Sequence, residues 1–565
     1  MRPLVRALLL GLVVLGSIRS QDVHVVHADE NGVEAVRLEA FVSGGSERGV
    51  GLGWIRFELE NLSERAYAIS VELSSRRFSR NDVATRKGVT LEAHGRSSFF
   101  LPVTVPPDSG RVVVEVDGSQ YEAGINFARG RGHVGLFVSD QSGTGSFGLA
   151  VLEAMPSDTA NPKPYVTGSD ALPADWRFFT SFSAVVVDGR ARLGAEVQDA
   201  LRRYAYVGGR VVVATPSLLP AGPLRDAVGD RAGVRDHGMG QLAAIGALGG
   251  DTTRMRQVLA EMRRLGDGVW PAPYDLFAEQ DIAGLGKAPV TAFLLVILLF
   301  AILVGPVNFW VLKKRKQPLL ALVTVPVLGF GTTFVILTYG IFHDGFGVRG
   351  VTRSWTLLDQ VEHEGATISA RTLFAGLAPS DLTTEQQSMV LSGRAGLSRR
   401  DGPDRWHWDG DRGVLGGGVL PSRTITPLLS AQQGPVRERL TVRRSGDALE
   451  VLADGGLKPV GNMVLRDLDG DYWAGTDGRL TRTDAVDGAA KFLGMLRESR
   501  QVRVDAGDRT TRLELPAVLP RWGARGTYAT KVQAAPWIDE HGMTIEYDGQ
   551  QHWVFGRMHS QDFVQ

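Results

Sequence analysis

The chain has 565 residues, no cysteine, and equal numbers of basic and acidic side chains, 62 of each. This length predicts several domains, and the balanced charge gives no reason to expect binding to nucleic acid. The missing cysteine excludes disulfides, thiolate metal sites, a thiol nucleophile and an acylated cysteine anchor.

The first twenty residues have the layout of a secretory signal peptide. Arg2 and Arg6 precede the apolar run 7–18, and Ser20 offers a small residue for cleavage. The run is too short to cross the hydrocarbon layer of roughly 30 Å comfortably. We therefore expect residues 1–20 to direct export, with an uncleaved anchor as the alternative.

Two uncharged segments near the middle of the chain, 289–312 and 318–342, are each long enough to span a membrane. A short basic loop between two spans belongs on the cytoplasmic side. The sequence thus predicts two transmembrane helices within residues 289–342 of a multi-pass protein of the cytoplasmic (inner) membrane. Both large soluble regions would then lie on the periplasmic or extracellular side, the alternative being a pair of buried core helices. The predicted cytoplasmic loop, 313–317, contains Lys313, Lys314, Arg315 and Lys316.

Residues 22–128 show apolar side chains at every second position, separated by turn-rich pieces. This period is typical of half-buried antiparallel strands, and the spacing predicts an exported Ig-like β-sandwich. The clearest alternations are Ile55, Phe57 and Leu59, then Ile69, Val71 and Leu73.

Residues 131–280 alternate between buried strands and amphipathic helices, which predicts an α/β domain with a parallel sheet. A helix over 193–207 is followed by Gly208 and Gly209, a typical C-terminal stop. A further helix is expected over 146–155, and strands over 133–140, 183–188, 210–215 and 238–246.

The run VVVDG from Val185, with LGAEVQDALRRYAYVGGRVVVATP after it, resembles the class I glutamine amidotransferase-like fold in its non-catalytic bacterial membrane forms. The segment GPVNFWVLKKRKQPLLALVTVPV resembles a group of uncharacterised bacterial two-span membrane proteins that carry such a domain. That resemblance implies an exported sandwich and an α/β domain before the hairpin and a β-rich tail after it. Catalytic amidotransferases need a cysteine nucleophile, so the resemblance does not imply glutamine hydrolysis.

The loop after the first α/β strand holds the main candidate ligand residues. Asp140, Ser142 and Thr144 follow the Asp-x-Ser-x-Thr spacing in which oxygen ligands hold Mg²⁺ in von Willebrand A-type domains. Asp188 and Thr215 are nominated to complete such a set from later loops. The same loop contains GxGxxG, ending at Gly148, and a partial nucleophile elbow around Ser146, although a turn that caps a helix explains both.

Residues 345–565 are rich in short strands and in Gly and Asp, and predict a β-rich exported domain built like a sandwich. The stretch 379–418 is expected to form a long exposed loop, and Asp467 to Asp471 an Asp-Gly hairpin turn. Trp406 and Trp408 are either a sugar-stacking patch or a local cluster under a loop. Strands are expected over 351–358, 366–374, 438–442, 449–452, 462–465, 502–504, 511–515 and 544–547, with a helix over 484–496.

These features favour a non-catalytic cell-envelope protein whose exported domains bind protein partners in a membrane complex serving transport or envelope assembly. We expect no enzyme activity, no cofactor and no nucleic-acid partner. The alternative is a metal-dependent binder or hydrolase-like enzyme that uses Mg²⁺ at the Asp140 loop.

Overall fold

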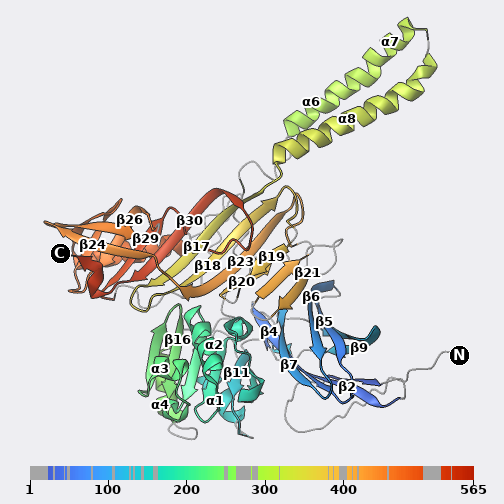
Figure 1. The fold of residues 1–565 in the computed structure, drawn as a ribbon. Coiled ribbons are helices and arrows are strands. Elements are labelled where there is room, and N and C mark those ends of the chain that lie inside the picture. Colours follow the sequence, from blue (N-terminus) through green and yellow to red (C-terminus); the bar gives the residue numbers. More distant parts are fainter. Residues whose placement is uncertain are drawn as a thin grey trace.

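The protein is a multidomain, β-rich chain in which several sheets and one α/β unit stand beside a long helical arm (Figure 1). The structure is a computed structural model. It describes residues 23–564 except for 29–31, 43–44, 47–50, 78–79, 105–108, 126–128, 131–133, 142–144, 157–162, 247–251, 263–281, 283–289, 317, 380, 386, 393–403, 410–411, 417–418, 455–456, 501–523 and 536. The expected signal peptide and the expected strands over 502–504 and 511–515 lie outside the described residues.

The N-terminal unit contains the two antiparallel sheets expected of a sandwich. One sheet has the order β1-β2-β4-β7, and the other contains β6-β5-β8-β9. Phe57 and Leu59 of the first sheet and Ile69 and Val71 of the second lie in one buried core, as the two-residue period predicts. The strands are β1 (Val23–Ala28), β2 (Glu34–Val42), β4 (Leu52–Asn61), β5 (Tyr67–Arg77), β6 (Arg80–Leu91), β7 (Arg96–Thr104), β8 (Ser109–Val116) and β9 (Ser119–Ile125), beside the short pair β3 (Gly45–Ser46) and β10 (Arg129–Gly130).

The second unit is a six-stranded sheet with the order β12-β11-β13-β14-β16-β15, parallel except for β15. Helices cover both faces: α1 and α4 pack on one, α2 and α3 on the other. This confirms the predicted parallel sheet, to which the structure adds β12 and β15. The elements are β11 (Val134–Val138), α1 (Gly145–Ala154), β12 (Lys163–Thr167), η1 (Ser169–Ala171), η2 (Trp176–Ser181), β13 (Ala184–Asp188), α2 (Ala195–Tyr206), β14 (Arg210–Ala214), η3 (Pro216–Leu218), α3 (Pro223–Val228), β15 (Gly233–His237), β16 (Gly240–Ile245) and α4 (Thr252–Ala260).

The helical arm projects away from the sheets and runs out and back (Figure 1). Its outward limb is α6 (Val290–Ile302), η4 (Leu303–Val307) and α7 (Asn308–Lys314), and its return limb is η5 (Pro318–Leu320) and α8 (Ala321–Asp344). The segment η4 is a π-helix that contains Pro306, because proline removes one backbone donor from the helical ladder. One helix among the described residues, Leu294–Lys314, is long and apolar enough to cross a membrane by length and composition, and only 6% of its most apolar window is buried.

The C-terminal part forms a twelve-stranded sheet with the order β20-β23-β18-β17-β30-β29-β26-β27-β28-β25-β24-β31. The sheet curls over a second core, since the Gln360 side chain after β17 donates to the Leu440 carbonyl of β24 at 3.0 Å. The strands are β17 (Val348–Asp359), β18 (Glu364–Ala375), β20 (Ser388–Ser392), β23 (Ile425–Pro435), β24 (Arg439–Ser445), β25 (Ala448–Asp454), β26 (Pro459–Arg466), β27 (Tyr472–Thr476), β28 (Arg479–Thr483), β29 (Thr527–Val532), β30 (Ile545–Arg557) and β31 (Phe563–Val564), with α9 (Ala485–Arg500) and η6 (Ser560–Asp562).

The expectation of a long exposed loop over 379–418 is wrong. Besides β20, this stretch contains β19 (Asp381–Thr384), β21 (Asp404–Asp409) and β22 (Arg412–Gly416), which extend the second sandwich sheet to β19-β22-β21-β6-β5-β8-β9. Its Gly, Asp and Arg content is typical of a loop. The strands nevertheless form because β6, more than 300 residues earlier, supplies the backbone partners for β21.

Candidate functional site

Arg177 in η2 lies where the three soluble parts of the chain meet. Its side chain is fully buried and donates several hydrogen bonds to the Asp175 carboxylate. Two of them run from Nε to Oδ2 at 2.9 Å and from Nη2 to Oδ2 at 2.6 Å. Its Nη1 donates to the carbonyls of Glu385 and Ser388, at 2.8 and 3.2 Å. The guanidinium also stacks over the Trp408 ring in β21. A buried charge with these partners ties the α/β unit to strands that follow the helical arm.

Aromatic side chains complete this junction. Phe178 lies 5.6 Å from Trp408, and Phe179 lies 5.5 Å from Trp54 of the sandwich, measured between ring centres. The Leu52 amide donates to the Thr180 hydroxyl at 2.9 Å. Trp408 is 4% exposed, so of the two expectations for this aromatic pair, the buried local cluster is confirmed for Trp408.

A second connection joins α2 to the C-terminal sheet. Arg202 makes two parallel bonds of 2.9 Å to the Glu364 carboxylate, and the Tyr206 hydroxyl donates to the Glu364 carbonyl at 3.1 Å. Bidentate pairs of this kind fix orientation as well as distance. The α/β unit is therefore held against both neighbouring sheets.

The Asp140 carboxylate lies at the carboxyl edge of the parallel sheet, where open α/β folds bind ligands. It accepts bonds from the Ser169 amide (2.7 Å), the Ser169 hydroxyl (2.9 Å) and the Arg192 amide (2.9 Å). Burial alone would raise the pKa of Asp140, but these donors outweigh it and hold the pKa below its usual value. Asp140 thus joins the loops that follow β11, β12 and β13.

The other residues nominated for a metal site are placed as follows. Asp188 is buried and accepts from the Arg190 side chain and from Ser139, and the Thr215 amide donates to the Ile245 carbonyl. Ser142 and Thr144 lie outside the described residues. Within the part of the chain that the structure describes, no three His, Asp or Glu side chains are grouped to share a metal ion.

The glycine pattern of the same loop has a packing explanation. A side chain at Gly148 would place its Cβ 2.6 Å from the Phe137 ring, so glycine lets α1 approach the sheet closely. The packing of Gly148 accounts for this glycine without a bound dinucleotide, and it adds no residue to an amidotransferase-like site.

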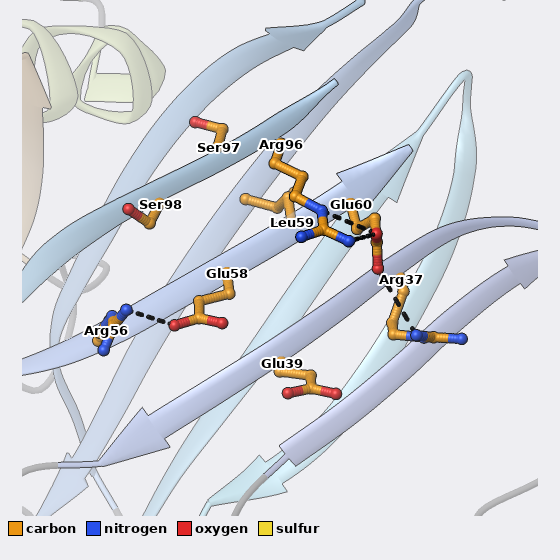
Figure 2. Close-up of a pocket in the computed structure, with 9 residues that line it drawn as sticks. All are labelled: Arg37, Glu39, Arg56, Glu58, Leu59, Glu60, Arg96, Ser97 and Ser98. Atoms are coloured by element: carbon orange, nitrogen blue, oxygen red, sulfur yellow. Dashed lines mark hydrogen bonds and ion pairs between the residues drawn. The ribbon is translucent and has the colours of Figure 1, made fainter. Parts of the chain in front are cut away.

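A charged hollow of about 400 Å³ lies on the outer face of the first sandwich sheet (Figure 2). Arg96 pairs with Glu60, Arg37 lies 3.6 Å from Glu60, and Arg56 lies 2.5 Å from Glu58. These residues come from β2, β4 and β7, and their alternation with apolar positions places them all on the solvent side. The remaining lining residues are Glu39, Leu59, Ser97 and Ser98.

Arg56, which lines this hollow, also contacts the segment that binds Asp140. Arg56 Nη1 lies 3.4 Å from Asp170 Oδ2 in η1, and the preceding residue, Ser169, is the donor to Asp140. We name this combined surface, from Arg37, Arg56 and Arg96 to Asp170 and Asp140, the charged face. The charged face cannot be recognised in the sequence because cross-strand register, not chain order, brings these side chains together.

A second hollow, of about 450 Å³, lies on the C-terminal sheet beside Trp537 and Asp539. The Ser388 hydroxyl donates to Asp539 Oδ2 at 2.8 Å, and His541 Nδ1 lies 3.0 Å from the same oxygen. Because the carboxylate stands between serine and histidine, the imidazole is not placed to take the serine proton. The arrangement is that of a structural clamp.

The four basic residues of the predicted cytoplasmic loop gather at the far tip of the helical arm. Lys313 and Lys314 end α7, and Arg315 and Lys316 form the turn that follows, all of them exposed. Lys314 Nζ lies 5.4 Å from the centre of the Trp310 ring. The tip is therefore strongly basic and carries an aromatic side chain of the kind found at membrane interfaces.

Neither a family model nor a curated protein matches the chain. Among solved structures it is similar to an alkylpurine DNA glycosylase of Pseudomonas fluorescens at 14% identity and TM-score 0.14, covering 16% of this chain and 30% of the other. It is similar to a β-glucosidase of Listeria innocua at 15% identity and TM-score 0.14, covering 18% and 17%. A carbohydrate acetylesterase of Xanthomonas citri gives 10% identity and TM-score 0.17, covering 79% and 100%. Likenesses this distant carry no functional argument.

Proposed function

We propose that this chain is a non-catalytic, multi-pass protein of the cytoplasmic membrane whose soluble parts form one body outside the cytoplasm and bind protein partners in an envelope complex. The α/β unit would be a non-catalytic amidotransferase-like domain of that body. The pairing of β21 with β6 carries the proposal.

β21 follows the helical arm and β6 precedes it, yet they share a parallel register from Asp404 opposite Val83 to His407 opposite Arg86. A sheet cannot be divided between two sides of a bilayer, because its backbone bonds run directly from strand to strand. The pairing therefore supports an even number of crossings between the two strands. With the outward limb as one crossing, α8 supplies the second.

The length of α8 agrees with this role. Its 24 residues extend about 36 Å at 1.5 Å per residue, against a hydrocarbon thickness of about 30 Å. The basic tip formed by Lys313 to Lys316 supports a cytoplasmic turn. The signal-like residues 1–20 independently favour export of the sandwich, so both features support the same orientation.

The cysteine-free sequence allows a direct test of this topology. Single cysteines would be introduced at the exposed positions Gln120, Arg315 and Asp447, which precede, divide and follow the two limbs. We expect a membrane-impermeant maleimide to label Gln120→Cys and Asp447→Cys in intact spheroplasts, and Arg315→Cys only after permeabilisation. Labelling of Gln120→Cys and Asp447→Cys from opposite sides would overturn the proposal.

Partner binding is assigned to the charged face. Arginine is enriched at protein interfaces, and exposed ion pairs such as Arg96 with Glu60 are weak enough to be exchanged for a partner's charges. Tagged full-length protein would be purified from native membranes in mild detergent, and co-purifying proteins identified by mass spectrometry. We expect stoichiometric partners that Arg56→Glu with Arg96→Glu removes.

The control for this pull-down is Arg111→Glu, which breaks an exposed pair with Glu122 on the other sandwich sheet. It should retain the partners. A protein that purifies without partners, or partners that are lost equally from both variants, would count against the assignment.

A further inference from the structure

The connection between α8 and the C-terminal sheet is very short. α8 ends at Asp344, Gly345 takes a positive φ of 75°, and β17 begins at Val348. Only residues 345–347 separate the helix from the strand. The end of the sheet must therefore lie close to the level at which α8 ends.

Backbone contacts fix this connection to the sheet. The Gly376 amide donates to the Gly347 carbonyl at 2.9 Å, and the Leu377 amide donates to the Phe346 carbonyl at 3.2 Å. A Cβ at Gly376 would lie 2.2 Å from the Gly345 carbonyl oxygen, so only glycine permits this approach. The helix exit is thus joined to the turn after β18 as well as to β17.

A residue before the outward limb packs against the same end of the sheet. Ile282, which precedes α6, is 2% exposed and is packed with Phe374 of β18 and Val351 of β17. Chain from both sides of the helical arm thus contacts one end of the sheet, where β17 begins and β18 ends. These contacts fix that end of the sheet to the chain on either side of the arm.

Three large apolar side chains at this end of the sheet are nevertheless exposed. Phe346 is 52% exposed, Leu377 is 59% exposed and Ile425 is 39% exposed. Phe346 and Leu377 are linked by their backbones, and Ile425 is the register partner of Phe374. We name these three residues the exit patch.

We propose that the exit patch rests in the interfacial layer of the lipid bilayer and fixes the angle of the exported body to the membrane. This rests on the proposed function, because it takes α8 as a span. A span needs about 20 residues, and α8 has 24, so its last turn already reaches the headgroup layer. That layer is about 5–8 Å deep on each side, and the exit patch begins two residues beyond the helix. Apolar and aromatic side chains at this depth are stabilised by leaving water.

The test uses single cysteines carrying an environment-sensitive NBD fluorophore in full-length protein in nanodiscs. The nanodiscs contain no spin-labelled lipid, lipid spin-labelled at the headgroup, or lipid spin-labelled in the acyl chain. Phe346→Cys, Leu377→Cys and Ile425→Cys report on the exit patch. Leu493→Cys on α9 is a matched control with 55% exposure, and Phe334→Cys within α8, 68% exposed, reports on the span. We expect blue-shifted emission at the three patch positions and at Phe334, with loss of intensity from headgroup-labelled lipid at the patch and from acyl-chain-labelled lipid at Phe334, and neither effect at Leu493.

Quenching at Phe334 together with Leu493-like emission at the patch would overturn this inference and leave the proposed membrane anchoring intact. Absence of quenching at Phe334 would overturn the anchoring and, with it, the inference. All five positions are exposed, so each labelled protein should melt at the temperature of the unlabelled parent; this is checked before the fluorescence is read.

Discussion

The guanidinium carbon of Arg177 lies 4.4 Å from the centre of the Trp408 ring. Arg177 precedes the helical arm and Trp408 follows it, so this contact joins the soluble chain before the arm to the soluble chain after it. The same guanidinium satisfies the Asp175 carboxylate and two backbone carbonyls. Its removal would leave the two carbonyls without this donor and the Asp175 carboxylate with the Arg177 backbone amide alone among these donors.

We therefore predict that Arg177→Met opens the junction. Loss of one partner of a buried ion pair costs about 3–5 kcal/mol, because the remaining charge stays uncompensated. The measurement is hydrogen exchange of the β21 amides in the full-length protein, which reports the free energy of local opening. Arg203→Met is the control, since its pair with Asp199 is a partly exposed helical one and should cost less than about 1 kcal/mol. Equal exchange in the two variants would contradict the role given to Arg177.

A second prediction concerns Asp140. Asp140→Ala removes the acceptor for the Ser169 and Arg192 amides, and should loosen the loops after β11, β12 and β13 by about 1 kcal/mol per lost bond. We expect millimolar Mg²⁺ to leave the melting temperature of parent and variant unchanged, because the carboxylate already has internal donors. Stabilisation by Mg²⁺ in the parent alone would favour the metal-binding alternative.

The parallel sheet could be predicted because its signals are local. Val185 to Val187 and Val211 to Val213 are continuous apolar runs, and the Gly208-Gly209 stop separates α2 from the strand after it. Each of these features lies within about ten residues of chain, the range over which sequence period identifies an element. The order and register of the strands, and the presence of β12 and β15, were not predicted and come from the structure.

The junction and the charged face could not be predicted in the same way. Arg177 lies in a short aromatic segment with no period, and its carbonyl partners are 208 and 211 residues away. β21 likewise depends on β6 for its strand conformation. The charged pairs of β2, β4 and β7 become visible only when cross-strand register is known.

A third prediction addresses the turn expected at Asp467. The turn is present between β26 and β27, and the Asp467 carboxylate accepts from the amides of Gly470 and Asp471 and from Trp473 Nε1, each at 2.8 Å. Asp467→Ala should destabilise the β26–β27 hairpin by about 1–3 kcal/mol, because these donors lose their acceptor. Local opening measured by hydrogen exchange at β27 would report the loss. Asp469→Ala, two residues along the same turn and exposed, should change it little; equal effects would show that the carboxylate bonds are not what stabilises the turn.

The last prediction is a pH dependence centred on His552. The imidazole is buried, with Nδ1 2.8 Å from the Ser354 hydroxyl and Nε2 3.1 Å from Gln550 Oε1. Burial, assisted by the positive charge of Arg371, lowers the pKa of His552 to about 4, against about 6.5 in the unfolded chain.

The unfolded chain therefore binds more protons than the folded one between these two values, and the stabilising contribution of the neutral ring is complete above pH 6.5. It should fall as the pH drops from about 6.5 to about 4, by up to about 1.4 kcal/mol per pH unit, and change no further below that. Hydrogen exchange of β30 across this range would measure the slope.

In His552→Asn, which keeps an acceptor for Ser354, the slope should become shallower. Some slope should remain, because burial also lowers the pKa of His541, which lies beside the same sheet. His363→Asn alters an exposed histidine whose positive φ asparagine also adopts, and it should leave the slope unchanged. A parent-like slope in His552→Asn would show that another group titrates in its place.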